Sequence, residues 1–218
     1  MTTTGTPLAK KLRPNYLRVR LAPGGADICR LHNTLEGLLA IQETRFLYGL
    51  AKDAKTVVEI GSFRGKSCVL MLEGAKANGN IDVRITCIDP HEPTHFGAFK
   101  DEDHDAFETT IRDHGFADRV DHRRMYSHDA RQQWEGPPID VLWVDGDHSY
   151  EGAKTDLADW GPLVRPGGTV AAHDTYRERF PGCLQAWNET IDASDEWGPT
   201  QRCRTIAWAV KLEGGTGL

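Results

Sequence analysis

The chain has 218 residues, of which 39% are hydrophobic and 27% charged. That length suits one large domain with its own core, and no apolar run approaches the roughly 20 residues that a membrane-spanning helix needs. The formal net charge of −6 argues against a general nucleic-acid binder, which normally carries a broad basic face.

The predicted elements alternate between helix and strand. Residues 1–33 are expected to form an N-terminal extension or lid. Its first 26 residues favour an irregular tail, with binding of an anionic partner as the alternative, because they are rich in Thr, Pro and Gly and contain bases but no acid. From Thr34 the apolar residues recur every three or four positions, which predicts a helix with Thr34 as its N-cap. Strands are predicted at 56–60, 83–88, 120–125, 139–144, 169–172 and 205–210. Further helices are predicted at 67–76, 106–114, 152–163 and 183–193, with a turn at 165–168. This alternation indicates parallel βαβ units in an open sheet with helices on both faces.

The cysteines indicate a reducing compartment. The chain holds five, an odd number, widely spread and with no C-x-x-C pair. Such usage is typical of thiols that serve as small core side chains. The first 15 residues also lack the apolar stretch of a secretory signal. We therefore expect a cytoplasmic protein.

A glycine loop follows the first predicted strand, in the run E-I-G-S-F-R-G-K-S at 59–67. Gly61 and Gly65 allow a tight turn and a close approach to a ligand, and the next helix can present its N–H groups to an anion. A P-loop would need four residues between the glycines, and there are three. A dinucleotide-binding dehydrogenase would need glycine where Phe63 stands. The E-x-G-x-x-x-G pattern resembles the first motif of class I S-adenosylmethionine (SAM)-dependent methyltransferases, with an ordinary strand–helix turn as the plain alternative.

Asp89 ends the second predicted strand, 24 residues after Gly65. A carboxylate at this spacing can accept hydrogen bonds from the two hydroxyls of a ribose. No basic residue lies nearby, which argues against a ligand with a 2′-phosphate. The plain alternative is an incidental surface acid. With the glycine loop, Asp89 favours an adenosine-containing cofactor.

Acids gather where two further strands end. Asp145 follows one apolar strand, and His173 and Asp174 follow the next. Neighbouring strand ends lie close together, and carboxylates that meet there repel one another unless a cation intervenes. Oxygen ligands suit Mg²⁺, Mn²⁺ or Ca²⁺, and an imidazole shifts the preference toward Mn²⁺ or Fe²⁺. The alternative is a metal-free polar cleft.

The runs D-G-D-H-S-Y-E-G at 145–152 and R-P-G-G…H-D at 165–174 make the resemblance specific. From about residue 34 to residue 212, the chain resembles the small class I methyltransferases grouped as methyltransferase family 24. Its layout is also similar to catechol O-methyltransferase and the macrolide sugar O-methyltransferases. The resemblance implies a Rossmann-like, doubly wound α/β fold with a mostly parallel seven-stranded sheet. We place this domain at 34–218, after the extension at 1–33.

The resemblance also implies roles for individual residues. The cofactor residues would be Glu59, Gly61, Phe63, Gly65, Ser67, Asp89, Ser127, His128 and Asp145. The metal ligands would be Asp145, His173 and Asp174, and the catalytic base would be His148. The catechol and macrolide enzymes carry an acid where this chain has His173. Histidine is a poorer Mg²⁺ ligand, so an alternative role for His173 is to orient the substrate.

These residues predict a SAM-dependent, divalent-metal-assisted O-methyltransferase for a small hydroxylated molecule such as a sugar or a polyketide. In this hypothesis an ion, Mg²⁺ or Mn²⁺, lowers the pKa of the acceptor hydroxyl, and His148 takes its proton. The alternatives are an N-methyltransferase of the same fold without metal, a nucleotide-binding oxidoreductase, and a non-catalytic cofactor binder. Neither nucleic acid nor a membrane is an expected partner, and a homo-oligomer is left open.

Loops at the same edge of the sheet are expected to shape the acceptor pocket. Candidate acceptor contacts are Tyr150, Tyr176, Arg177 and Arg179. The segment 91–105 also holds His91, His95 and His104 among several acids. One interpretation is a second metal site. The favoured interpretation is a helix start, where the helix dipole stabilises acids.

Overall fold

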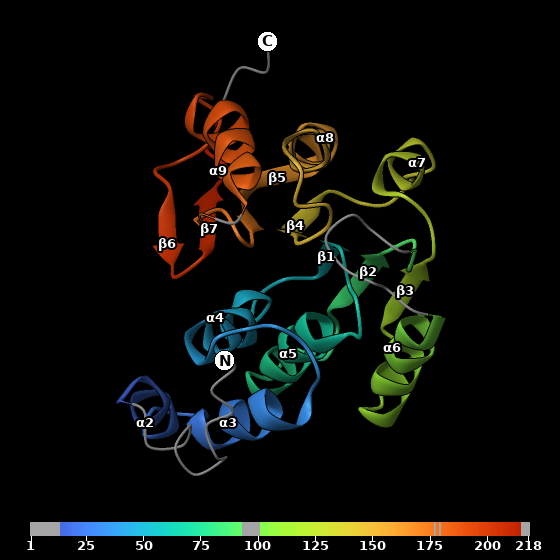
Figure 1. Cartoon of the computed structure of the whole chain (residues 1–218), viewed down its shortest axis with the longest axis vertical. Coiled ribbons are helices and arrows are strands. Elements are labelled where there is room, and N and C mark those ends of the chain that lie inside the picture. The colour runs from blue at the N-terminus through green and yellow to red at the C-terminus, as the bar shows by residue number, and fades with distance from the viewer. Residues whose placement is uncertain (1–13, 93–100, 177, 179, 215–218) are drawn as a thin grey trace.

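Within the described residues, a seven-stranded sheet with helices on both faces makes up the molecule (Figure 1). The computed structural model describes residues 14–92, 101–176, 178 and 180–214. The strands are β1 (Thr56–Ile60), β2 (Arg84–Ile88), β3 (Val120–Arg123), β4 (Ile139–Val144), β5 (Val164–Ala172), β6 (Gln201–Cys203) and β7 (Ile206–Val210). The helices are α2 (Pro14–Arg20), α3 (Gly25–Thr34), α4 (Ile41–Leu50), α5 (Lys66–Ala77), α6 (Asp101–Asp113), α7 (Ser127–Gln132), α8 (Tyr150–Trp160) and α9 (Pro181–Trp187). Two short turns of helix, η1 (Gly161–Leu163) and η2 (Asn188–Asp192), follow α8 and α9.

The strand order is β3-β2-β1-β4-β5-β7-β6. The pairs from β3 to β5 are parallel, whereas β7 runs antiparallel to both β5 and β6. The predicted doubly wound, mostly parallel sheet is therefore confirmed. The chain changes direction along the sheet between β1 and β4, and ligands of such sheets bind outside the carboxyl ends of the strands at this point.

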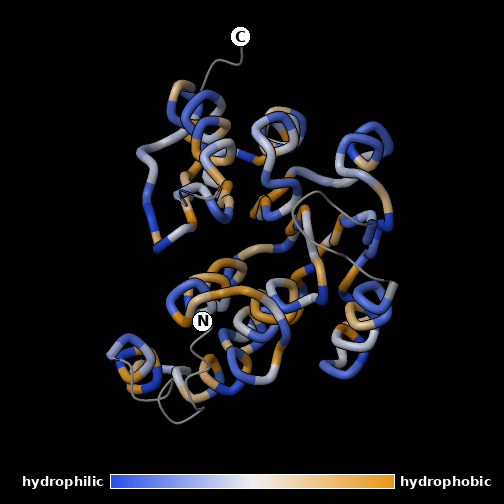
Figure 2. The backbone as a smooth tube through the Cα atoms, viewed as in Figure 1, coloured by the Kyte–Doolittle hydropathy of each residue, from blue (hydrophilic) through white to orange (hydrophobic). Residues whose placement is uncertain are grey.

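The sheet separates two apolar layers. On one face, a core cluster joins α2 through α6 to the sheet, with Leu47, Leu70 and Phe107 almost fully buried. On the other face, a second cluster joins α7, α8 and α9, with Leu157 and Trp187 at its centre. Figure 2 shows the same division, because the apolar segments run through the strands and the helix sides that face them. Burial on both faces explains why the central strands are continuous apolar runs.

The N-terminal region is helical where the structure describes it, so the expected irregular extension at 1–33 is wrong for that part. Helices α2 and α3 bury residues such as Tyr16 in the same core as α4 and α5. Thr34 is the last residue of α3, and its hydroxyl donates to the carbonyl of Arg30 (3.0 Å). Its prediction as an N-cap is therefore wrong, and the next helix starts only at Ile41. The division between extension and domain stays a prediction.

Three further elements differ from the sequence prediction. The turn predicted at 165–168 lies inside β5, where Gly167 has a φ of +75°. The register with β4 shifts at this point, between Ile139 and Val141. Helix α7 and strand β6 were not predicted, because each is short and mostly polar or exposed.

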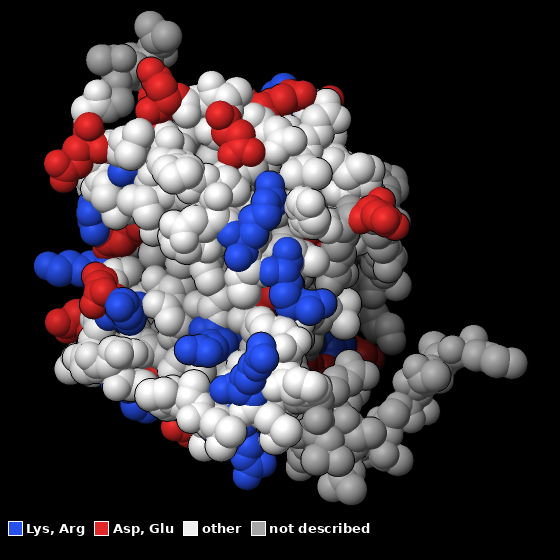
Figure 3. All heavy atoms as spheres, turned by 90° about the vertical axis from the view of Figure 1, so that its left-hand side faces the viewer, with Lys and Arg blue, Asp and Glu red and all other residues white. Residues whose placement is uncertain are grey.

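The surface charge is uneven despite the net charge of −6. Figure 3 shows the face on which α4 and β6 lie, and Lys and Arg side chains gather along its middle. Helix α4 carries the exposed Arg45, and the segment around β6 carries the exposed Arg202 and Arg204. In the part of the chain that the structure describes, no helix combines the length and apolar character needed to cross a bilayer.

The contact between α4 and α5 gives a test of the packing. A Cβ atom added at Gly74 on α5 would lie 1.6 Å from the carbonyl oxygen of Tyr48 on α4. Gly74→Ala should therefore push the helices apart and lower the unfolding free energy by about 1–3 kcal/mol or more.

The matched control is Gly49→Ala on α4, where an added Cβ meets nothing within 4 Å. This change should raise the unfolding free energy by about 0.5–1 kcal/mol, because alanine is the better helix former. Urea unfolding of both variants measures the difference. Equal effects in the two variants would contradict the close helix contact.

Candidate active site

The glycine loop adopts a turn that only these residues allow. Gly61 and Gly65 have φ values of +85° and +81°, and Phe63 between them has a φ of +45°. A Cβ atom on Gly61 would lie 2.1 Å from the carbonyl oxygen of Asp145. Glycine at position 61 is thus required where the loop after β1 passes the end of β4. Helix α5 begins directly after Gly65, so its first N–H groups lie at this edge of the sheet.

Lys66 and Arg64 anchor the outer side of the glycine loop. The Lys66 ammonium donates to the carbonyl of His32 on α3 (3.2 Å) and to that of Leu35 in the connection between α3 and α4 (3.0 Å). Arg64 donates to Asp103 on α6 (2.6 Å). It also pairs with Glu36, which lies in the connection between α3 and α4. A P-loop lysine must reach a bound phosphate, and Lys66 instead points into the protein. This geometry agrees with the spacing argument against a P-loop.

Glu59 is fully buried at the end of β1, beside the glycine loop. Its Oε2 accepts a hydrogen bond from Cys87 Sγ (3.2 Å). Its Oε1 and the hydroxyl of Ser62 have no hydrogen-bond partner among the described residues. Burial raises the pKa of Glu59 to about 7, and the nearby Ser67 and Cys87 offset only part of this effect. Buried polar atoms normally find a partner, so these two atoms fit a polar ligand held beside the loop.

Asp89 lies at the end of β2, next to the glycine loop. Its Oδ2 accepts a hydrogen bond from the backbone N–H of Phe63 (2.8 Å). Its Oδ1 accepts one from the backbone N–H of His91 (2.7 Å). Each carboxylate oxygen has a second lone pair, so Asp89 can hold the loop and still accept hydrogen bonds from a diol. The structure therefore brings the predicted ribose acid to the predicted cofactor loop.

Ser127 and His128 stand at the start of α7, and both side chains reach α8. The Ser127 hydroxyl donates to the carboxylate of Asp156, and His128 Nδ1 pairs with Asp159 (2.8 Å). Burial raises the pKa of Asp156 to about 7, although Ser127 offsets part of this effect. These contacts join α7 to α8. A contact between either side chain and an adenine stays a prediction.

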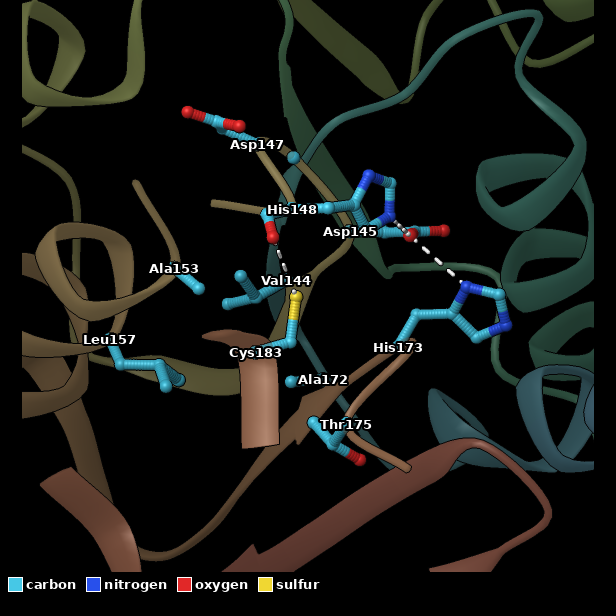
Figure 4. A pocket seen from close by; sticks show the side chains of 11 residues that line it. Val144, Asp145, Asp147, His148, Ala153, Leu157, Ala172, His173, Thr175 and Cys183 are labelled. Atoms are coloured by element: carbon cyan, nitrogen blue, oxygen red, sulfur yellow. Dashed lines mark hydrogen bonds and ion pairs between the residues drawn. The ribbon is translucent and has the colours of Figure 1, made fainter. Parts of the chain in front are cut away.

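The acidic cluster forms where β4 and β5 end side by side. The backbone N–H of His173 donates to the carbonyl of Val144 (2.9 Å), which fixes the two ends together. His173 Nδ1 lies 3.1 Å from Asp145 Oδ1. His148 Nε2 lies 3.5 Å from Asp145 Oδ1 and 3.3 Å from Asp174 Oδ2. Figure 4 shows Asp145, His148 and His173 turned toward one another. The structure thus gathers Asp145, His173 and Asp174, which the strand ends placed at this edge, and brings His148, the base that the resemblance implied, to the same cluster.

Glu43 is a member of this cluster that sequence reasoning missed. It is buried on α4, and its Oε2 lies 3.7 Å from His173 Nε2. Its Oε1 accepts hydrogen bonds from the hydroxyl (2.6 Å) and the backbone N–H (3.2 Å) of Thr205. His173 is therefore placed between the carboxylates of Glu43 and Asp145. The available signal was weak, since Glu43 looked like one more polar residue of an amphipathic helix.

The charges in this cluster stabilise one another. Burial disfavours a charged His148, but its hydrogen bonds to Asp145 and Asp174 outweigh burial and raise its pKa to about 9. Burial likewise opposes a charged His173, and Asp145 and Glu43 outweigh it and raise the pKa to about 10. Burial would raise the pKa of Glu43, yet His173 and Thr205 bring it down to about 2. The two imidazoles thus act as positive partners of the carboxylates.

The donor set for a metal ion differs in one residue from the expected one. Asp145, His148 and Asp174 offer ligand atoms that all lie within 4.8 Å of one another. His173 instead faces a carboxylate with each ring nitrogen. Two carboxylates and one imidazole fit a divalent ion such as Mn²⁺ or Mg²⁺. The ligand role of His173 stays a prediction.

Residues in and just before α9 contact His148. The Phe180 ring stacks on it, with ring centres 4.4 Å apart and an angle of 22° between the planes. Cys183 Sγ donates to the backbone carbonyl of His148 (3.5 Å), as Figure 4 shows. A cavity of about 10 Å³, large enough for roughly one water molecule, adjoins these groups. These contacts fix the ring so that Nε2 faces the carboxylates.

The candidate acceptor contacts fall into different places. The Tyr150 hydroxyl binds Glu189 (2.5 Å), which ties α8 to the segment after α9. Tyr176 is 63% exposed, and the guanidinium of Arg202 lies 4.8 Å from the centre of its ring. Arg177 and Arg179 lie outside the described residues. Of the two described candidates, Tyr176 is thus the more open to an acceptor.

Glu59→Gln tests the buried carboxyl. The folded-state pKa of about 7 lies above the ordinary value of 4.5, so the wild type loses stability as the pH rises from 4.5 through 7. The uncharged glutamine does not titrate. The variant's unfolding free energy, measured in urea relative to wild type, should therefore increase between about pH 5 and pH 8. The control Glu151→Gln, on the exposed start of α8, should show the same difference at both pH values. A pH-independent effect of Glu59→Gln would contradict the raised pKa.

Comparisons with known proteins agree on the family. A family model described as a methyltransferase domain matches residues 58–175, which is more than half of the chain. The uncharacterised protein R132 of Acanthamoeba polyphaga mimivirus is 28% identical over 145 residues. That match covers 64% of this chain and 61% of the viral protein, so the chain spans less than two thirds of this relative's length.

Solved structures share the fold at low sequence identity. An O-methyltransferase from Bacillus cereus in complex with SAH has a TM-score of 0.64 and 19% identity, covering 91% of this chain and 92% of that one. The O-methyltransferase TomG from Streptomyces achromogenes, in complex with SAM, has a TM-score of 0.62 and 14% identity, covering 92% and 91%. Together with the matched family model and the motifs at the strand ends, this fold shows that the chain belongs to the class I SAM-dependent methyltransferases, in methyltransferase family 24.

Proposed function

We propose that this chain transfers a methyl group from SAM to a hydroxyl oxygen of a small molecule. One observation carries the proposal. The glycine loop and Asp89 lie at the same edge of the sheet as Asp145, His148 and Asp174, and the loop touches the end of β4 at Gly61. A donor site and a proton-accepting site therefore adjoin each other. The family match and the O-methyltransferase neighbours support the same conclusion.

The donor half would be held by the residues around the glycine loop. Asp89 would accept hydrogen bonds from the ribose hydroxyls, and the loop between Gly61 and Gly65 would let the ligand approach the backbone. The free oxygen of Glu59 lies on the same side, among buried polar atoms. When bound, SAM supplies a methyl group that its sulfonium has already activated. The task left to the chain is to position the acceptor and remove its proton.

On the acceptor side, His148 is the proposed base. The step requires the neutral form of His148, which a cation bound at Asp145 and Asp174 would favour. As the hydroxyl oxygen forms its bond to the methyl carbon, the bond from that carbon to sulfur breaks and the hydroxyl proton passes to Nε2 of the neutral His148. Phe180 stacks on the ring and keeps its orientation. Asp145 and Asp174 face the same nitrogen and stabilise the charged imidazole that results. His173 pairs with Asp145, and Glu43 pairs with the other ring nitrogen of His173.

A divalent ion fits the same carboxylates. Asp145 and Asp174 would be its ligands, and His148 Nε2, which lies close to both carboxylates, would stay available as the base. When bound, the ion would hold the acceptor oxygens, lower the pKa of the hydroxyl and replace the imidazole as the positive partner of the carboxylates. His173 is the least suited donor, because Asp145 and Glu43 already face its two nitrogens.

Asp89→Asn tests the donor site. Calorimetry should show that SAH binds about 10- to 100-fold more weakly, because a hydrogen bond to a charged group contributes about 1.5–3 kcal/mol. Wild type should also bind SAH more tightly than its 2′-deoxy analogue, and the variant should not distinguish the two. General damage to the loop would weaken both ligands equally. Asp82→Asn, an exposed acid just before β2, is the matched control and should bind like wild type.

Tight binding of NAD with no binding of SAH or SAM would contradict the proposal and favour the oxidoreductase alternative.

His148→Ala tests the acceptor site. SAH release from SAM should be followed with a panel of sugars, catechols and polyketides. Loss of a general base should lower kcat by about 10²- to 10⁴-fold while SAM binding is retained. Dialysis against EDTA should abolish turnover, and added Mn²⁺ should restore it. Asp147→Asn is the control, since its side chain points away from the cluster (Figure 4).

Full turnover in His148→Ala would contradict its role as base, and full turnover after EDTA would contradict the metal. Transfer confined to amines, without metal, would favour the N-methyltransferase alternative.

A further inference from the structure

Three histidines come together near β2 and β3, whereas the acidic cluster lies at the ends of β4 and β5. His91 follows β2, His104 lies on α6 and His122 lies on β3, three elements that are adjacent in Figure 1. The ring centres of His91 and His104 are 5.3 Å apart, those of His91 and His122 are 5.2 Å apart, and those of His104 and His122 are 5.3 Å apart. The three rings thus form a nearly equilateral triangle.

A carboxylate completes the group. His104, Glu108 and His122 offer ligand atoms that all lie within 4.8 Å of one another. Glu108 Oε1 lies 2.9 Å from His122 Nδ1. A carboxylate that holds one nitrogen of an imidazole leaves the other nitrogen oriented for a metal ion, and this arrangement is common around zinc. The spacing of His104 and Glu108, one turn apart on α6, places both on the same side of the helix.

Several nitrogens of this group are buried and have no hydrogen-bond partner among the described residues, although His91 Nδ1 lies 4.0 Å from Asp89 Oδ1. His91 is 2% exposed, and neither of its ring nitrogens has a hydrogen-bond partner among the described residues. The same holds for Nε2 of His122. His91 also has a φ of +50°, a strained conformation that proteins keep mainly at functional sites. These observations do not depend on the short distances between the three rings, and they point to a ligand that binds the ring nitrogens.

Aromatic packing alone explains the cluster less well. Phe107 packs against His91 and His122, with ring centres 5.8 Å and 4.3 Å away. Such packing would be served equally by phenylalanine or leucine at positions 91 and 122. With histidine it leaves polar nitrogens buried without hydrogen bonds, which costs free energy. A ligand that takes up these nitrogens removes that cost.

We propose that His91, His104, His122 and Glu108 form a binding site for a divalent transition-metal ion of the zinc class. An ion at the centre of the triangle would lie about 3 Å from each ring centre, which matches a ring that points at zinc with a bond of about 2.0–2.1 Å. His91 joins by turning its ring, since no hydrogen bond among the described residues holds that ring in place. Imidazole-rich sites prefer Zn²⁺, Co²⁺ or Ni²⁺ to Mg²⁺, so this site and the carboxylates at Asp145 select different ions.

The position suggests what the ion does. The backbone N–H of His91 donates to Asp89, whose other oxygen holds the glycine loop. An ion on the three histidines ties the segment after β2 to α6 and β3 and so holds Asp89 in place. Its role is structural support of the donor site, and it does not depend on the proposed methyl transfer.

Zinc titration of the metal-free protein tests the site. Wild type should bind Zn²⁺ at this site, and the double variant His104→Gln/His122→Gln should lose one molar equivalent. The double variant Asp145→Asn/Asp174→Asn should retain that equivalent, which separates the two clusters. His114→Gln, a half-buried histidine paired with Glu73, is the matched control and should bind like wild type. Added Co²⁺ should give wild type a visible absorption band that the histidine double variant lacks.

Glu108→Gln gives an independent check, because Glu108 is exposed and its replacement should leave the fold intact. Its zinc affinity should fall by about 10- to 100-fold. Circular dichroism shows whether each variant is folded, and if the histidine double variant is not, the Glu108 variant decides. Absence of zinc binding by wild type would overturn the proposal. Zinc binding equal to that of wild type in the folded histidine double variant or in the Glu108 variant would also overturn it.

Discussion

The close approach between the loop after β1 and the end of β4 is the constraint on which the site depends. The backbone N–H of Asp145 donates to the carbonyl of Ile60 (2.8 Å), and the carbonyl of Asp145 lies where a side chain at position 61 would begin. Because the strands are parallel neighbours, this single contact places the donor loop and the acidic cluster next to each other. A residue larger than glycine would separate them, and the two halves of the reaction would no longer share one edge.

In the acidic cluster, the positive charge of His173 is balanced by a carboxylate from another element, Glu43 on α4. The sequence resemblance implies an acid at the position where this chain has His173. Here the cation at that position lies between two carboxylates, Asp145 on β4 and Glu43 on α4. Glu43 is fixed in turn by the hydroxyl of Thr205. The negative charge is therefore supplied from a helix instead of from β5, and His173 becomes part of the support of Asp145.

The sequence predicted the elements whose residue types are dictated by burial. It did not predict the elements and side chains whose positions depend on a few specific contacts. The apolar runs of β1 and β4 are buried on both faces, so their positions and the acids after them followed from the pattern. Helix α3 was missed because Gly24, Gly25 and Pro23 look like a turn and its apolar side is short. Glu43 could not be found either, because its partners His173 and Thr205 are about 130 and 160 residues away. The three histidines share this difficulty, since β3 brings His122 to the others only in three dimensions.

The N-terminal helices belong to the support of the donor loop as well as to the core. Lys66 begins α5 and donates to carbonyls at the end of α3 and in the connection after it, and Gly37 in that connection packs against its side chain. Burial lowers the pKa of Lys66 to about 8, so this buried amine depends on the carbonyls that surround it. Arg64, inside the loop, is paired with Asp103 on α6. The loop is thus held by the sheet on its inner side and by charged contacts on its outer side. A movement of the α3–α4 connection would therefore displace the glycine loop directly, because Lys66 and Arg64 join the two.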